Sequence, residues 1–252
     1  MAPKSAQRVL PLVSAAAFIA MWQVVARFYP PEQFPAPTDV VKALVELSAD
    51  GVLWGHIGVS LARFGSAYLL ALVTAVPLGL LLGRQPLARC AVDPLIQLLR
   101  PISPIAWFPL AVLWFGIGNA PAVFIIFLSV FFPILVSTIS AVVKVPVIYL
   151  KVAANFGTRP LPTFLRVVVP AAFPGIMVGL HIGVGTGWIH LVAGEMLGAQ
   201  SGLGFMIIDA RNFLRTDWIL AGMLVVGLLG LLINRVMRLA ELWLGRRWGG
   251  AA

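Results

Sequence analysis

Three side chains on one apolar stretch have types that could bind an anion or carry a proton. His181, Trp188 and Glu195 recur every seven residues, so at 100° per residue they share one face of a helix. An ionisable group inside a membrane span is a functional candidate by default. The alternative is that Glu195 lies near a water boundary and His181 is hydrogen-bonded to a neighbouring helix, because polar groups also join helices in membranes.

The opposite face of this stretch is made of glycine. Gly175, Gly179, Gly183 and Gly187 recur every four residues. Small residues at that spacing let another helix approach closely. We therefore expect one face to pack tightly while the other presents polar and aromatic groups.

A basic segment precedes this stretch. Residues 143–170 contain Lys144, Lys151, Arg159 and Arg166 and no acidic residue. A segment of this kind beside a membrane either binds a partner or faces anionic lipid.

The same segment carries the signals of a short helix. Pro146 suits the first turn of a helix, and Gly157 suits its end, where a left-handed residue is needed. Pro160 and Pro162 are expected to delay the next helix. The pattern predicts a short helix that lies across one face and fits into a partner's groove.

The elements around these residues are expected to cross a membrane. Of the 252 residues, 60% are hydrophobic and only 11% charged. Apolar runs of about 18 residues or more indicate spans, and their backbone groups must be bonded within helices. We expect an all-α integral membrane protein with a single transmembrane domain over residues 1–252. Six spans are expected, in Leu10–Phe28, Phe64–Gly83, the two halves of Pro101–Val143, Val167–Gly194 and Trp218–Asn234.

The connections between the spans have patterns of their own. Residues 38–48 predict an amphipathic helix on the outer surface, and residues 84–100 an inner loop. Prolines kink the third expected span, and residues 116–121 break it from the fourth. The apolar face of the amphipathic helix is assigned to Val40, Val41, Leu44, Val45 and Leu47, and the kinking prolines are Pro101, Pro104 and Pro109.

The charge distribution sets the expected orientation. The net charge is +9, and basic residues concentrate on cytoplasmic loops of membrane proteins. With both termini inside, thirteen of the 18 Lys and Arg residues fall on the inner side; the five on or near the outer side are Arg27, Lys42, Arg63, Arg211 and Arg215. Orientation explains the basic composition, so no nucleic-acid partner is needed. We expect a multi-pass protein of the bacterial cytoplasmic membrane with cytoplasmic termini.

The basic segment resembles the EAA loop of ATP-binding-cassette importer permeases. That motif reads Glu-Ala-Ala, three residues, Gly, nine residues, then Ile-x-Leu-Pro. Ala153, Gly157 and Pro170 keep its spacing here, and Val167 and Val169 replace the branched aliphatics. Lys151 departs from it, because most members carry Glu at that position.

Other strings resemble the nitrate/sulfonate/bicarbonate (taurine-type) permeases of that class. The resemblance extends from about Phe34 to the C-terminus. Its strings are Phe34–Pro37, Leu99–Leu110, Trp114–Gly118, Phe131–Leu135, Gly194–Leu197 and Ser201–Phe205.

This resemblance implies a type I ABC importer permease (MetI-like) fold and a set of partners. These are a second permease copy, two cytoplasmic ATPase subunits, an external substrate-binding protein and the bilayer. The chain lacks G-x-x-x-x-G-K-[ST], so ATP and Mg²⁺ are expected on the ATPase, and this chain has no catalytic, metal or cofactor residues. The residues implied to couple to the ATPase are Tyr149, Lys151, Ala153, Ala154, Gly157 and Pro170.

The implied cargo is a small oxyanion: an alkanesulfonate such as taurine, nitrate or bicarbonate. An anion that crosses a low-dielectric region needs donors or a cation nearby. Candidates for the pathway are Ser103, Trp107, His181, Trp188, His190 and Glu195, together with Arg100, which an anchoring role at the inner edge explains equally.

Two other functions would use some of the same residues. In an ion-coupled carrier or channel for a small anion, Glu195, His181 and His190 would form a proton relay. Such a carrier needs no folded inner loop of this spacing, and six spans without an internal repeat are few for one. In a membrane anchor or scaffold, the kinked third span and the polar face of the fifth would be unnecessary.

Overall fold

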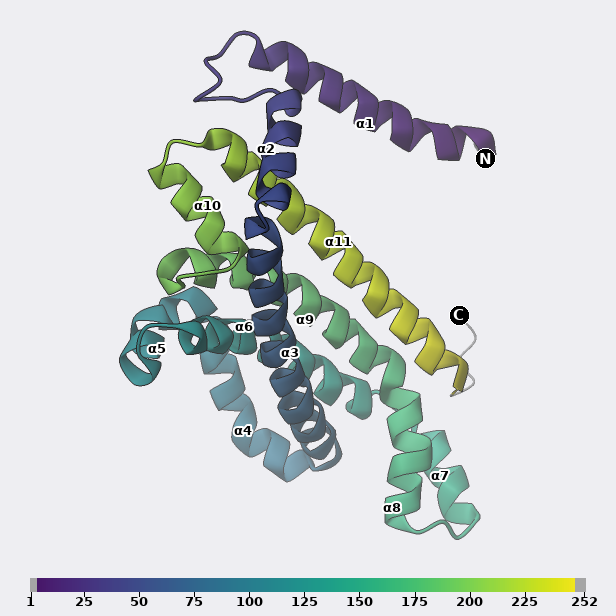
Figure 1. Ribbon diagram of the computed structural model, residues 1–252. Coiled ribbons are helices and arrows are strands. Elements are labelled where there is room, and N and C mark those ends of the chain that lie inside the picture. The colour runs from purple at the N-terminus through teal and green to yellow at the C-terminus, as the bar shows by residue number, and fades with distance from the viewer. Residues whose placement is uncertain (1–3, 248–252) are drawn as a thin grey trace.

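The computed structural model describes residues 4–247, and all regular structure there is helical (Figure 1). The predicted domain limits at residues 1 and 252 lie outside this part. In chain order the elements are α1 (Lys4–Ala26), α2 (Pro37–Ala49), α3 (Val52–Arg84), α4 (Pro86–Leu99), the 3₁₀ turn η1 (Pro104–Trp107), α5 (Phe108–Phe115), α6 (Asn119–Val143), α7 (Val147–Asn155), α8 (Pro160–Thr163), the π-helical turn η2 (Phe164–Val168), α9 (Val169–Gly198), α10 (Leu203–Asn212) and α11 (Thr216–Arg247).

Within residues 4–247, four helical stretches are long and apolar enough to cross a membrane: α3, α6, residues 160–198 and residues 216–245. The pair α4 and η1–α5 passes the same criterion as one broken span, so the total is four or five rather than the six expected. The first expected span corresponds to a shorter apolar stretch of α1, Leu10–Ala26.

The third expected span differs most from the prediction. Within the expected loop of residues 84–100, residues 86–99 form the helix α4, and the chain then bends by 85° before η1 and α5. Pro101 accounts for the end of α4, because it lacks the N–H that would continue the helical hydrogen bonds; Arg100 before it still has helical backbone angles. Pro104 begins η1, and Pro109 lies in the first turn of α5.

Helices α3, α6 and α9 form the core, and glycines set how closely they pack. An added Cβ at Gly175 would lie 2.6 Å from the Cβ of Ala141, and one at Gly179 would lie 2.5 Å from the Cβ of Ser137. Gly79 of α3 meets Thr138 of α6 in the same way. The predicted glycine face of α9 is confirmed, and its partner is α6.

Helix α2 packs mainly against α11 and α3, and its buried residues are Val40, Ala43 and Leu47. The helix was predicted, but its buried face was only partly right, because Val41 and Val45 are exposed. Helix α1 extends away from the core (Figure 1).

The chain between α6 and α9, which includes α7, projects at one end of the bundle, called the α7 end (Figure 1). Helix α10 lies at the opposite end, called the α10 end (Figure 1).

Candidate functional site

A cavity of about 270 Å³ lies beside the bend that follows α4. Its walls come from the end of α4, the bend, η1, α6 and α9. Irregular backbone at membrane depth is tolerated where it lines a cavity, and the prolines create such a stretch here. The lining residues are Leu99, Arg100, Ile102, Pro104, Trp107, Phe124, Leu128, Ser129, Phe132, Pro133, Thr186 and His190.

This cavity combines apolar walls with a few polar groups. The Nδ1 of His190 lies 2.8 Å from the carbonyl oxygen of Thr186, and the Thr186 hydroxyl donates to the Ser129 carbonyl at 3.0 Å. A carbonyl only accepts, so the proton of a neutral His190 is on Nδ1. Nε2 can donate to an anion only when the ring is protonated. Arg100 adds a permanent positive charge to the lining.

The sequence candidates for the pathway separate into two groups. Trp107, His190 and Arg100 line the cavity, and Ser103 is exposed at the bend without lining it. The remaining three, His181, Trp188 and Glu195, lie outside it in contacts with other helices.

Two of these three join α9 to other helices. The Trp188 ring packs edge-on against Phe64 with centroids 5.4 Å apart, and its indole N–H donates to the Val226 carbonyl at 3.0 Å. His181 Nε2 lies 2.9 Å from a carboxylate oxygen of Glu241 in α11. These contacts match the alternative interpretation, in which polar groups connect helices.

Glu195 is fully buried in an ion pair near the α10 end. The guanidinium of Arg63 donates to its carboxylate at 2.7 Å, the Ser60 hydroxyl reaches both of its oxygens at 2.8 and 2.9 Å, and the backbone N–H of Gly204 donates at 2.9 Å. Neither histidine takes part in this cluster. Full hydrogen bonding of this kind is what makes a buried charge tolerable.

The remaining donors of Arg63 connect the cluster to two further segments. They reach the Asn119 side chain at the start of α6 and both the carbonyl and the hydroxyl of Ser201, at 2.6 and 2.8 Å. We call Ser60, Arg63, Asn119, Glu195 and Ser201 the buried polar cluster. It joins α3, α6, the end of α9 and the loop before α10.

The basic segment contains the predicted short helix, α7. The Gly157 N–H donates to the Ala154 carbonyl at 2.9 Å, and the Thr158 N–H donates to the Ala153 carbonyl at 3.1 Å. These two bonds form a Schellman motif, and φ of +67° at Gly157 supplies its left-handed residue. The predicted glycine stop is therefore confirmed.

The rest of the segment differs from the prediction at its prolines. Pro160 does not delay the next helix but begins it. Pro170 cannot donate a backbone hydrogen bond, and the turn just before it is π-helical, with the Val169 N–H bonded to the Phe164 carbonyl. Tyr149 and Lys151 are exposed on α7, whereas Ala153 is buried.

Most of this sequence is similar to known membrane transport proteins. Residues 75–250 match the family described as binding-protein-dependent transport system inner membrane component. The taurine transport system permease protein of Escherichia coli is 35% identical over 94% of this chain and 88% of its own length. The chain belongs to this family of ABC importer permeases.

Other relatives agree. A nitrate import permease protein of Synechococcus elongatus is 34% identical over 91% of this permease and 85% of its own length. A putative aliphatic sulfonates transport permease protein of Bacillus subtilis is 32% identical over 91% and 84%. A chain from inward-facing conformations of the MetNI methionine ABC transporter has a TM-score of 0.62 at 19% identity, covering 80% of this permease and 98% of that chain. That likeness supports the type I importer fold.

Several residues of the permease's polar sites were missed from the sequence, among them Arg63, Ser60 and Thr186. Arg63 was placed near the outer side because the second span was expected to begin at Phe64, whereas α3 begins at Val52 and contains it. Ser60, three residues earlier on the same helix, was not predicted for the same reason. Thr186 could have been found, because it lies four residues before His190 and so on the same helical face.

Proposed function

We propose that this permease is the membrane subunit of an ATP-driven importer for a small oxyanion. The observation that supports this most is the near full-length similarity to permeases named for taurine, aliphatic sulfonates and nitrate. These cargoes share a compact, negatively charged oxygen centre. Bicarbonate belongs to the same chemical class.

The proposed assembly follows from the two ends of the bundle. The α7 end, with its basic segment, faces the cytoplasm, in accord with the concentration of positive charge on that side. Two ATPase subunits there bind ATP and Mg²⁺, and a second copy of the permease completes the pore. An external substrate-binding protein delivers the anion at the α10 end.

Helix α7 is the proposed lever. Its exposed face carries Tyr149 and Lys151, while Ala153 anchors its other face against the core. Closure of the ATPases on ATP would push α7 and favour one of two conformers of the pore. Such coupling requires the ATP-bound partners to have a higher affinity for one conformer than for the other.

The cavity beside the bend is the proposed pathway for the anion. Arg100 offers a fixed positive charge, and His190 offers a donor when it is protonated. The break between α4 and η1 interrupts the apolar helical surface on this side of the cavity. The apolar residues of the lining leave only a few polar groups that an anion could contact.

A charge reversal on α7 tests the lever. We expect Lys151→Glu to lower ATP hydrolysis stimulated by the loaded binding protein, because the side chain is exposed on the docking face. Lys144→Glu is the matched control, since it makes the same charge change outside α7. Equal coupling in the Lys151 variant and the native complex would show that this side chain does not contact the ATPase.

Two substitutions in the cavity test the pathway. Loss of a hydrogen bond to a charged group reduces binding by roughly tenfold, so Arg100→Gln and His190→Gln should lower anion uptake by about that factor. His181→Ala is the control, because His181 pairs with Glu241 outside the cavity. Unchanged uptake rate and anion selectivity in both cavity variants would place the pathway elsewhere.

A further inference from the structure

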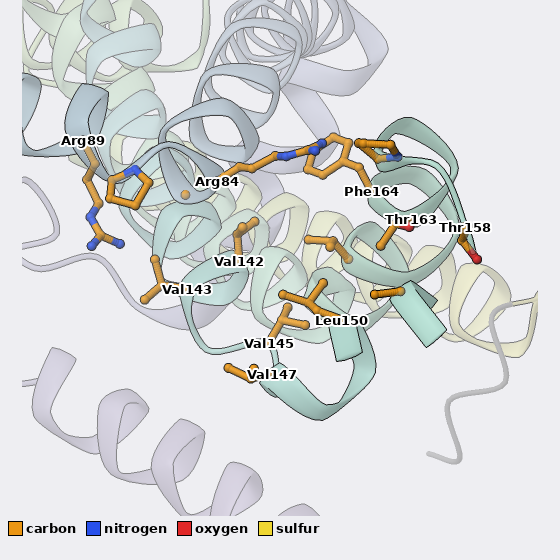
Figure 2. Close-up of a pocket in the computed structure, with 15 residues that line it drawn as sticks. Arg84, Arg89, Val142, Val143, Val145, Val147, Leu150, Thr158, Thr163 and Phe164 are labelled. Atoms are coloured by element: carbon orange, nitrogen blue, oxygen red, sulfur yellow. The ribbon is translucent and has the colours of Figure 1, made fainter. Parts of the chain in front are cut away.

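A second, larger cavity lies at the α7 end (Figure 2). Its volume is about 480 Å³, within the range of about 300–1,000 Å³ typical of ligand pockets. It lies between the basic segment on one side and the ends of α3, α4 and α6 on the other. It shares no lining residue with the cavity beside the bend.

The depth of this cavity is set by the candidate spans around it. Gly83 and Arg84 end the span formed by α3, and Val142 and Val143 end the span formed by α6. The stretch that begins at Pro160 starts its own crossing there. Three candidate spans therefore end or begin at this cavity, so it lies at the α7 end of the membrane-spanning bundle.

The lining divides into an apolar floor and a basic edge. Val142, Val145, Leu150 and Val168 contribute apolar surface. Arg84 extends toward Phe164, its guanidinium carbon 5.0 Å from the ring centroid, and Arg89 lies on the α4 side of the opening (Figure 2).

Neither arginine has an acidic ion-pair partner in the described part of the chain. All the lining residues belong to the described part of the chain, and none of them is acidic. Within residues 4–247, no carboxylate forms an ion pair with Arg84 or Arg89. The contact with Phe164 uses the face of the Arg84 guanidinium and leaves its N–H groups free to bind oxygen atoms.

We propose that this cavity binds an anionic phospholipid. Its anionic headgroup lies along the basic edge that Arg84 and Arg89 form, and part of an acyl chain lies on the valines and Leu150. Basic pockets between transmembrane helices on the cytoplasmic side are suited to bind anionic headgroups. The apolar floor distinguishes a lipid from a small soluble anion, which would gain nothing from it.

Such a lipid would act on the movement of α7. Its headgroup would contact the junction of α3 and α4, and its chain would contact the α7 side of the cavity. The lipid would then hold the basic segment in one position relative to the core. This site is independent of the cargo, so it can fail while the proposed transport function stands.

The test measures lipid binding to the purified full chain by native mass spectrometry. Phosphatidylglycerol and phosphatidylcholine are titrated separately. We expect Arg84→Gln/Arg89→Gln to weaken phosphatidylglycerol binding by roughly tenfold or more and to abolish the preference for it. Arg84→Lys/Arg89→Lys should keep most of the preference because the charge remains.

Two further variants separate this site from diffuse attraction. Arg235→Gln/Arg238→Gln removes the same charge from exposed positions on α11 and should leave binding within about twofold of native. Val147→Trp fills the cavity from an exposed wall position and should weaken the binding of both lipids. The thermal midpoint of each variant in detergent is measured first, so that a loss of lipid binding is not confused with a loss of folding.

Four results would overturn the proposal. Equal losses in the two Gln pairs would indicate surface charge alone, and unchanged binding in Val147→Trp would place the lipid outside the cavity. Displacement of the lipid by millimolar inorganic phosphate would indicate a site for a soluble anion. Loss of ATPase co-purification in Arg84→Gln/Arg89→Gln, with lipid binding unchanged, would assign these arginines to the protein partner.

Discussion

Glu195 is the residue whose surroundings most change its interpretation. The sequence placed it with His181 and Trp188 on a possible anion or proton pathway. In the structure Arg63, Ser60 and the Gly204 backbone saturate its carboxylate. A carboxylate that accepts this many hydrogen bonds is suited to joining helices. A proton carrier would also need a titratable group or water with which to exchange its proton.

Removing the charge of Glu195 should destabilise the permease strongly. In Glu195→Gln the buried Arg63 loses its counter-charge, which costs about 3–5 kcal/mol, so the thermal midpoint in detergent should fall by several degrees. Glu241→Gln is the control, because the His181–Glu241 pair is half-exposed and contributes about 1 kcal/mol or less.

The double variant Arg63→Met/Glu195→Met tests the same point from the other side. Removing both charges leaves no unpaired ion, so it should recover much of the stability lost in Glu195→Gln. If the double variant were no more stable than Glu195→Gln, the uncompensated charge would not be the cause of the loss.

Single residues were the least predictable scale. The Schellman stop at Gly157 depends on local backbone and could be predicted, because only a left-handed residue fits there. The partners of Glu195 could not, because Ser60 and Arg63 are more than 130 residues away in the chain. The joining role of Trp188 likewise depends on the position of α11, which periodicity does not give.

At the scale of elements, the contact between α6 and α9 depends on the absence of side chains. A Cβ at Gly179 would lie 2.5 Å from the Ser137 Cβ, whereas one at Gly185 would meet nothing within 4 Å. Gly179→Ala should therefore force the helices apart and cost about 1–3 kcal/mol. Gly185→Ala should be neutral or slightly stabilising, since alanine favours a helix over glycine.

Both substitutions are Gly→Ala on the same helix, so the difference in stability between them contains no contribution from helix propensity. Thermal unfolding in detergent reports the difference in midpoint. Equal midpoints for Gly179→Ala and Gly185→Ala would mean that α6 and α9 are not in close contact in the native protein.

We expect the attachment of α2 to depend on pH. Arg215 donates to the Glu46 carboxylate at 2.7 Å, and this hydrogen bond lowers the pKa of Glu46. A lowered pKa means that the contact stabilises the fold above the ordinary carboxyl pKa of about 4.3. The contribution is lost as the pH falls through the lower pKa of the folded state.

Hydrogen exchange of α2 should report this loss. We expect faster exchange in Pro37–Ala49 as the pH is lowered through the acid range, after correction for the intrinsic rate. In Glu46→Gln, exchange should already be raised at neutral pH and should show less additional pH dependence. A native α2 whose corrected exchange is flat with pH would remove this contact from the attachment of the helix.

The elements themselves were largely predictable, and their breaks were not. Apolar runs gave α3, α6, α9 and α11 because span length is fixed by the bilayer. The 85° bend after α4 was missed because a charge-free stretch with prolines was expected to kink and continue. Proline indicates where a helix is disturbed, but the angle depends on what the two parts pack against.

At the scale of the whole molecule, the permease has a polar structure at each end and a cavity at the bend between them. The buried polar cluster fixes one end, the basic segment lies at the other, and α3, α6 and α9 connect them. The short helix α7 could be predicted from the sequence. The two cavities could not, because each is formed by segments distant in the chain.

The proposed function makes the pore dependent on a motor at the α7 end. The most direct test uses proteoliposomes that contain the permease, its ATPase subunits and the loaded binding protein, with labelled taurine or nitrate as cargo. We predict accumulation above the equilibrium concentration only when hydrolysable ATP is present on the α7 side. Accumulation that persists without the ATPase subunits, or with a non-hydrolysable nucleotide, would contradict this function.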